Sequence, residues 1–198
     1  MEARNKNKTL LILDLDETLI HARETPLERK EAFKAFHFYV YLRPYLNDFL
    51  KQIRDDFLIA VWSSASEDYV QKIVDHIFPK DYPLEFVWGR KRCVYRSKRF
   101  SKDYGRYLSD YETPFFYLKP LQKVKRQGFR LERILIVDDS PEKVQNNYGN
   151  AIYPTEYTGN SEDDELLHLA AYLQTLKNKT NVRTIEKRGW KTEVQQGL

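Results

Sequence analysis

Acidic side chains follow two apolar stretches of this sequence. The chain reads LLILDLDET at residues 10–18 and ILIVDD at residues 134–139, and these motifs contain four aspartates: Asp14, Asp16, Asp138 and Asp139. Carboxylates next to buried strands are costly unless a cation or an ionic partner offsets their charge. Carboxylate oxygens suit Mg²⁺, which binds one or two of them together with water and substrate phosphate. The pattern therefore predicts that the four aspartates share a magnesium site.

The same residue types can transfer a phosphoryl group. Aspartate attacks phosphorus to form an aspartyl-phosphate, and a second carboxylate two positions on, such as Asp16, can protonate the leaving oxygen and later activate water. The phosphoryl oxygens need positive charge and hydrogen-bond donors, for which Ser64 and Lys119 are candidates. A lone D-x-D is weak, but the ordered set D-x-D-x-T, S-x-S, Lys and D-D favours this chemistry.

Apolar runs alternate with helical patterns along the chain. We predict strands at residues 9–16, 57–62, 132–137 and 151–154, and helices at residues 44–56, 66–78, from 141 onward and 163–176. This alternation indicates an α/β fold, with a parallel sheet and helices on both faces. Ligands of such sheets bind beyond the carboxyl ends of the strands, so both acidic motifs are expected at one crevice.

The length of 198 residues predicts a single domain over residues 1–198. A stretch at about residues 84–117 breaks the alternation, and we interpret it as a small basic and aromatic insertion. Residues 90–106 contain eight basic side chains against one acid; they form either a solvated loop or a surface that steers anionic substrates. The net charge of +4 is too mild to argue for nucleic-acid binding. After Lys177 the chain is polar, and we expect a loose tail.

The single cysteine, Cys93, excludes an internal disulfide framework and suits a reducing compartment. The first residues, MEARNKNKT, lack the apolar segment of a signal peptide. No apolar stretch approaches the ~20 residues of a membrane span. We therefore predict a cytoplasmic protein with no membrane association, and a nuclear location is not excluded.

The motifs together resemble the haloacid dehalogenase (HAD) phosphohydrolases, and within them the FCP/SCP carboxy-terminal-domain phosphatases, or NLI-interacting-factor-like group. DLDETLIHA, LRPYLNDFL, VWSSAS, KPL and ILIVDDSP occur in that order, from about residue 8 to the segment DDELLHLAAYL. The resemblance implies a Rossmann-like fold and a Mg²⁺-dependent phosphomonoester hydrolase that uses an aspartyl-phosphate. It also implies a phosphoserine or phosphothreonine protein as the substrate.

The resemblance also implies roles for the charged residues. Asp14 is similar to the nucleophile and metal ligand, and Asp16 to the general acid/base, which also offers its backbone carbonyl to Mg²⁺. Lys119 resembles the lysine that pairs with nucleophile and phosphate. Asp138 and Asp139 resemble the metal-binding pair.

Other matches concern the substrate. Thr18 resembles a threonine that braces the nucleophile loop, Ser64 stands where the family usually has a phosphate-binding threonine, and Arg90 resembles an arginine that grips the substrate phosphate. Two departures weaken the inference of substrate. In the small phosphatases, the stretch that corresponds to residues 23–42 is long and builds an apolar pocket. Here this stretch is short and partly charged. In addition, Glu67 stands where the family has an apolar residue.

Three alternatives remain open. The first is a phosphatase of small-molecule or nucleic-acid phosphate esters rather than of proteins. The second is a non-catalytic phosphoprotein-binding module, although such relatives usually lose an acid that this chain keeps. The third is a cysteine phosphatase, because Cys93 and Arg99 have C-x5-R spacing; against it, the loop lacks a glycine that would allow a tight anion cradle.

Overall fold

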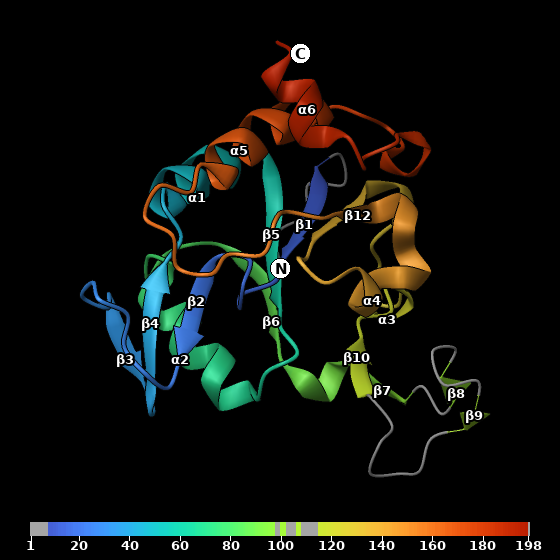
Figure 1. Ribbon diagram of the computed structural model, residues 1–198. Helices are drawn as coiled ribbons and strands as arrows, with labels where there is room; N and C mark the ends of the chain where they lie inside the picture. Colours follow the sequence, from blue (N-terminus) through green and yellow to red (C-terminus); the bar gives the residue numbers. More distant parts are fainter. Residues whose placement is uncertain (1–7, 98–99, 102–105, 108–114, 198) are drawn as a thin grey trace.

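A computed structural model describes residues 8–97, 100–101, 106–107 and 115–197. Its centre is a sheet of five parallel strands in the order β12-β11-β1-β5-β6 (Figure 1). The strands are β1 (Thr9–Leu13), β5 (Phe57–Trp62), β6 (Leu84–Trp88), β11 (Ile134–Val137) and β12 (Ala151–Ile152). Strand β1 is therefore central, with β11 on one side and β5 on the other.

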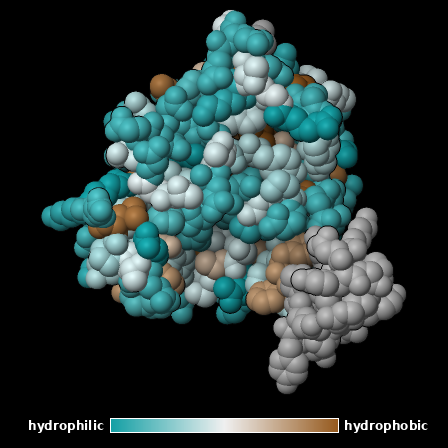
Figure 2. Space-filling view, viewed as in Figure 1, coloured by the Kyte–Doolittle hydropathy of each residue, from teal (hydrophilic) through white to brown (hydrophobic). Residues whose placement is uncertain are grey.

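The strands are continuously apolar because both faces of the sheet are covered. Leu11 and Leu13 of β1 pack in one core with four helices: α1 (Leu46–Arg54), α2 (Glu67–Ile77), α5 (Glu165–Leu176) and α6 (Trp190–Gln195). Leu10 and Ile12 face the other core, which includes residues at or in the short helices α3 (Gln122–Lys125) and α4 (Pro141–Val144). The outer surface in Figure 2 is largely hydrophilic as a result. The predicted α/β, Rossmann-like sheet with helices on both faces is confirmed.

Smaller elements flank this sheet. Strands β2 (Ile20–Arg23), β3 (Phe33–Ala35) and β4 (Phe38–Leu42) form an antiparallel sheet in the order β2-β4-β3. Two further pairs are antiparallel: β7 (Val94–Ser97) with β10 (Phe115–Leu118), and β8 (Phe100–Ser101) with β9 (Arg106–Tyr107). Four 3-10 helices complete the described elements: η1 (Arg90–Arg92), η2 (Leu131–Arg133), η3 (Gln145–Asn150) and η4 (Val182–Thr184).

The departure from the strand–helix alternation begins later than predicted. Residues 84–88, which we assigned to the insertion, form strand β6 and pair in parallel with β5 in the central sheet. The interruption therefore starts after Trp88 and consists of η1 and the strand pairs β7–β10 and β8–β9. Within the basic stretch 90–106, residues 98–99 and 102–105 lie outside the described residues.

The C-terminal segment is packed rather than loose. Val182 and Trp190 are buried, and the Trp190 indole nitrogen donates a hydrogen bond to the Tyr153 carbonyl at 3.1 Å. The ring of Trp190 lies 5.8 Å from that of Tyr172 on α5. The expectation of a loose tail is wrong for residues 182–195, because a few apolar side chains anchor an otherwise polar segment. Among the described residues, no helix combines the length and apolar composition that crossing a bilayer requires.

Candidate active site

The first acidic motif begins where central strand β1 ends. The Asp14 backbone N–H donates to the Val137 carbonyl at 3.0 Å, which extends the β1–β11 pairing by one residue. Asp138 follows Val137, so the two neighbouring strands bring two carboxylates side by side. Both side chains are buried. This placement agrees with the prediction that the two acidic motifs meet at one edge of the sheet.

Three carboxylates gather at this edge. Asp14, Asp138 and Asp139 each offer an oxygen within 4.8 Å of the others; we call these residues the carboxylate cluster. The Lys119 ammonium lies 2.9 Å from Asp14 Oδ1 and 2.6 Å from Asp138 Oδ2, and its side chain is fully buried. Lys119 thus bridges the carboxylates that follow β1 and β11.

A second lysine, which the sequence motifs did not indicate, faces the cluster. Lys143 Nζ lies 3.5 Å from Asp14 Oδ2 and 3.9 Å from both Asp138 Oδ1 and Asp139 Oδ1. Helix α4 begins at Pro141, directly after the second acidic motif, so its first turn carries Lys143 back over the carboxylates. The spacing of four residues from Asp139 was the signal that could have predicted this contact.

The charges in the cluster are unequal. Burial opposes ionisation of Asp14, but the charges of Lys119 and Lys143, together with hydrogen bonds from Lys119 and the Leu15 N–H, hold its pKa below the usual value. Burial, followed by repulsion from Asp14, raises the pKa of Asp138 to about 7. Asp14 is therefore ionised at neutral pH, as a nucleophile must be.

This donor set fits Mg²⁺. It consists of hard carboxylate oxygens, and the two lysines do not offset the effects of burial and of the Asp14 charge, which raise the pKa of Asp138. A divalent cation would relieve that repulsion. Asp14, Asp138 and Asp139 are the residues that could hold it.

Asp16 lies apart from the carboxylate cluster. Its Oδ1 accepts a hydrogen bond from the Tyr69 hydroxyl at 2.6 Å, and its Oδ2 accepts one from the Ser63 hydroxyl at 3.4 Å. Burial raises the pKa of Asp16, and the Tyr69 hydrogen bond only partly opposes this. The Asp16 side chain thus lies outside the carboxylate cluster, which contains three of the four predicted metal ligands. The ligand role of Asp16, through its backbone carbonyl, stays a prediction.

Thr18 joins the two acidic motifs. Its hydroxyl donates to Asp139 Oδ1 at 3.3 Å and accepts from the Asp139 backbone N–H at 3.2 Å. The side chain is buried. This geometry suits the bracing role that the resemblance implies for Thr18.

Comparison with known proteins gives the family of this chain. A family model described as "NLI interacting factor-like phosphatase" matches residues 9–183. The chain belongs to this family of phosphatases. Its relatives include CTD small phosphatase-like protein 2 of Dictyostelium discoideum, which is 28% identical over 89% of this chain and 29% of the relative. Another is nuclear envelope morphology protein 1 of Saccharomyces cerevisiae, 25% identical over 91% of this chain and 42% of the relative. The chain thus spans less than half the length of either.

A solved structure shows the same fold. Fcp1, described as an essential RNA polymerase II CTD phosphatase, superposes with a TM-score of 0.55 at 14% sequence identity, covering 98% of this chain and 63% of Fcp1. At this identity the likeness establishes the fold alone. It confirms the HAD-type architecture that the sequence motifs predict.

Ser64 and Arg90 lie together beside the site. The Arg90 Nε donates to the Ser64 carbonyl at 2.8 Å, and the guanidinium lies 5.2 Å from the centre of the Tyr117 ring. Ser64 is half-buried just after β5. The aromatic contact and the hydrogen bond hold the Arg90 charge at the rim of a neighbouring cavity.

That cavity has a volume of about 520 Å³ and opens next to Asp16. Phe36, Phe38, Tyr69 and Arg90 are among the residues that line it. The short and partly charged stretch 23–42 weakened the inference of a protein substrate. In the structure β2, β3 and β4 form a sheet, and Phe36 and Phe38 of this stretch line the cavity. Glu67 does not line this cavity; its Oε1 accepts a hydrogen bond from the Lys91 N–H at 2.7 Å.

Cys93 has the properties of a core residue. Its side chain is buried, its Sγ donates to the Ser63 carbonyl at 3.8 Å, and burial raises the pKa of the thiol. A cysteine nucleophile needs a thiolate, which this environment disfavours. The other half of the C-x5-R pattern, Arg99, lies outside the described residues.

Proposed function

We propose that this chain is a Mg²⁺-dependent phosphomonoester hydrolase that forms an aspartyl-phosphate at Asp14. The observation that carries the proposal is that Asp14, a member of the carboxylate cluster, is buried between two lysines that lower its pKa. Asp14 Oδ1 already accepts hydrogen bonds from the Leu15 N–H and from Lys119. Asp14 Oδ2 faces Lys143 at the longer distance of 3.5 Å, and we therefore assign the attack on phosphorus to Oδ2.

Two displacement steps follow from the residues present. In the first, Asp14 Oδ2 forms a bond to phosphorus, the bond to the ester oxygen breaks, and Asp16 gives that oxygen its proton. In the second, Asp16 takes a proton from water, the water oxygen attacks phosphorus, and inorganic phosphate leaves Asp14 free. A raised pKa suits Asp16 to donate and then recover a proton. Lys119 offsets the negative charge that Asp14 and the phosphoryl group share.

The metal has a defined place in this proposal. Asp14, Asp138 and Asp139 would hold Mg²⁺, with the Asp16 backbone carbonyl as the further ligand that the resemblance implies. When bound, the ion supplies positive charge next to the phosphoryl oxygens. Thr18 fixes Asp139 for this task through its paired hydrogen bonds. Ser64 and Arg90 are proposed to bind the phosphate of the substrate.

We propose a phosphoserine or phosphothreonine protein as the substrate. The cavity beside Asp16 has aromatic walls and an arginine at its rim, which suits a peptide side chain next to a phosphorylated residue. Fcp1 is named as a phosphatase of the RNA polymerase II CTD, which supports a protein substrate. The cytoplasmic location stays a prediction, since one relative is named for the nuclear envelope.

The test is phosphate release from p-nitrophenyl phosphate and from a phosphopeptide panel, with Mg²⁺ and with EDTA. We expect metal-dependent turnover that Asp14→Asn abolishes, because this isosteric change removes the nucleophile. A wild-type protein inactive on every ester in Mg²⁺ would favour the phosphoprotein-binding module. Turnover that survives EDTA but not alkylation of Cys93 would favour the cysteine mechanism.

A second comparison tests the cavity. Phe36 lines it and exposes 64% of its surface, so Phe36→Ala should raise KM for phosphopeptides and leave turnover of p-nitrophenyl phosphate unchanged. Leu167→Ala is a matched control, because Leu167 is an exposed apolar residue on α5 that does not line the cavity. Equal effects of Phe36→Ala on both substrates, or none, would contradict a peptide site here.

A further inference from the structure

We infer that Lys143 is a built-in counter-cation of the carboxylate cluster, which faces the metal-binding oxygens in the metal-free protein and withdraws when Mg²⁺ binds. The inference rests on the proposed use of Mg²⁺ at Asp14, Asp138 and Asp139. In this inference Lys143 controls the affinity for Mg²⁺, whereas Lys119 bridges Asp14 and Asp138.

The two lysines use different carboxylate oxygens. Lys119 contacts Asp14 Oδ1 and Asp138 Oδ2, whereas Lys143 faces Asp14 Oδ2 and Asp138 Oδ1. Lys143 also faces Asp139 Oδ1, so it meets all three members of the cluster. Lys143 therefore faces the oxygen of each buried aspartate that Lys119 does not contact, and one of these, Asp138 Oδ1, also accepts a hydrogen bond from the Ser140 N–H at 3.0 Å.

The distances show that Lys143 is loosely held. Its contacts of 3.5–3.9 Å are longer than the ~2.7–2.9 Å of a tight charge-assisted hydrogen bond. Lys119 makes tight contacts of 2.9 and 2.6 Å. An ammonium spread over three carboxylates without a short bond to any of them compensates charge without forming a fixed ion pair.

The side chain of Lys143 reaches solvent, whereas that of Lys119 does not. The side chain of Lys119 is fully buried, whereas 20% of the Lys143 side chain is exposed. Lys143 sits on a four-residue helix and carries its charge on a flexible four-carbon stem. The Lys119 backbone N–H donates to the Lys143 carbonyl at 2.7 Å, so the backbone of Lys143 stays anchored while its ammonium moves.

Charge balance supports an exchange between this ammonium and a metal ion. Three carboxylates face two lysines, so full ionisation of the cluster would leave one negative charge uncompensated. A divalent ion that replaced the Lys143 ammonium would complete the neutralisation. Two cations repel each other at this range, so Mg²⁺ binding and the observed position of Lys143 oppose each other, and Lys143 weakens metal binding.

The test is calorimetric titration of Mg²⁺ into the metal-free protein. We expect Lys143→Met to bind Mg²⁺ about tenfold more tightly than wild type, which is within the usual range of coupling between two competing ligands. Without metal this variant should unfold at a lower temperature than wild type, and the difference should shrink in saturating Mg²⁺. Lys143→Gln gives the same comparison if the methionine variant does not fold.

Two controls separate the possible outcomes. Lys177→Met removes one positive charge near Asp56, which precedes β5 at the opposite end of the sheet, and it should leave Mg²⁺ affinity unchanged. Asp138→Asn should weaken Mg²⁺ binding. If wild type binds Mg²⁺ but Lys143→Met binds it equally or more weakly, the inference about Lys143 is wrong while the proposed function stands. If wild type does not bind Mg²⁺, the metal-dependent function fails and the inference fails with it.

Discussion

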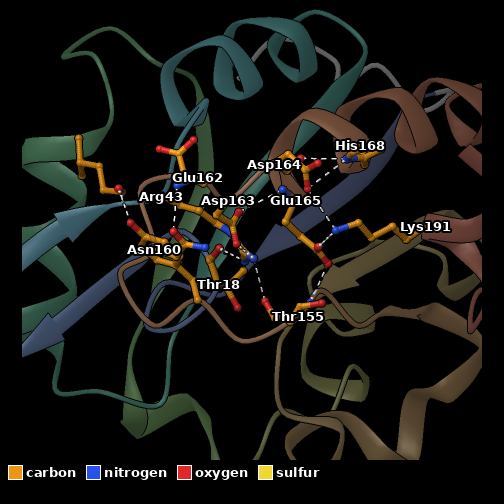
Figure 3. Close-up of polar contacts among 12 residues, drawn as sticks. Thr18, Arg43, Thr155, Asn160, Glu162, Asp163, Asp164, Glu165, His168 and Lys191 are labelled. Atoms are coloured by element: carbon orange, nitrogen blue, oxygen red, sulfur yellow. Dashed lines mark hydrogen bonds and ion pairs between the residues drawn. The ribbon is translucent and has the colours of Figure 1, made fainter. Parts of the chain in front are cut away.

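Arg43 ties the first acidic motif to the segment that follows β12, and its removal is the strongest stability test that the structure offers. Its guanidinium donates to both carboxylate oxygens of Asp163 at 2.8 and 2.9 Å. It also donates to the carbonyls of Thr18 and Thr155 at 3.0 and 2.9 Å. Figure 3 shows Arg43 at the centre of these groups. Because the Thr18 side chain hydrogen-bonds Asp139, Arg43 supports the loop that contacts the carboxylate cluster.

The size of the effect follows from burial. The Arg43 side chain is fully buried, and Asp163 exposes only 15% of its side chain. Arg43→Met keeps the apolar stem but removes the cationic partner of a mostly buried carboxylate and the Arg43 hydrogen bonds to two carbonyls, at a cost of about 3–5 kcal/mol. The Glu165 N–H still donates to Asp163 Oδ1 at 3.0 Å. For a chain of this size this cost corresponds to a fall in Tm of roughly 6–20 °C. Lys177→Met, which breaks a pair with side chains 33% and 30% exposed, should cost less than ~1 kcal/mol.

The assay is equilibrium unfolding in urea, with Arg43→Met, Asp163→Asn and the double variant compared in one cycle. We expect a coupling energy of at least about 1.5 kcal/mol, the lower range for a hydrogen bond to a charged group. The m-value should not change, because the fold is retained. A loss in Arg43→Met no greater than in Lys177→Met would refute the argument that burial makes this pair strong.

Three further predictions concern the site. Burial raises the pKa of the Cys93 thiol, so iodoacetamide should label the folded protein slowly at neutral pH, and Cys93→Ala should keep phosphatase turnover; rapid labelling with loss of activity would contradict this. Tyr69→Phe removes a hydrogen bond that lowers the pKa of Asp16, so the ionisation of Asp16 in the pH profile of kcat/KM should move to higher pH; an unchanged profile would separate Asp16 from that ionisation. Folding raises the pKa of Asp138 from 3.8 to about 7, so its contribution to the stability of the metal-free protein decreases as pH rises between these values. Differential scanning fluorimetry should therefore show a larger rise in Tm on adding Mg²⁺ at about pH 8 than at about pH 5, and an equal rise at both would count against Asp138 as a ligand.

The sheet was predictable because its strands are short, continuously apolar and followed by acids. Continuous burial of β1 leaves no polar alternation, which is typical of a strand covered on both faces. The contacts of Asp16 were not predictable in the same way, because Tyr69 lies 53 residues further along the chain. A pattern within one element does not show which hydroxyl of another element will face it.

The sequence-based expectations were least accurate for two segments that are polar or charged on average but contain a few apolar side chains that pack in the core. Residues 23–42 contain many charges, yet Phe33 and Phe38 pack against the core, and the charged residues occupy the exposed positions and turns. The segment after Lys177 is polar overall, yet Trp190 is buried. In both segments a few apolar side chains at regular or isolated positions are enough to order the backbone, and a composition average does not detect them.

The spacing of Asp14 and Asp16 acquires its meaning from the position of β1 at the centre of the sheet. Asp14 contacts Asp138, which follows β11, and the lysines on that side. Asp16 contacts Ser63, which follows β5, and Tyr69 on α2. One residue between the two carboxylates therefore sends them to neighbours on opposite sides of β1. On the first side, lysine charge outweighs burial and lowers the pKa; on the second, burial outweighs a single tyrosine hydrogen bond and raises it. A two-residue step along one loop thus gives one carboxylate a lowered pKa and the other a raised pKa, which suits the proposed roles of nucleophile and general acid.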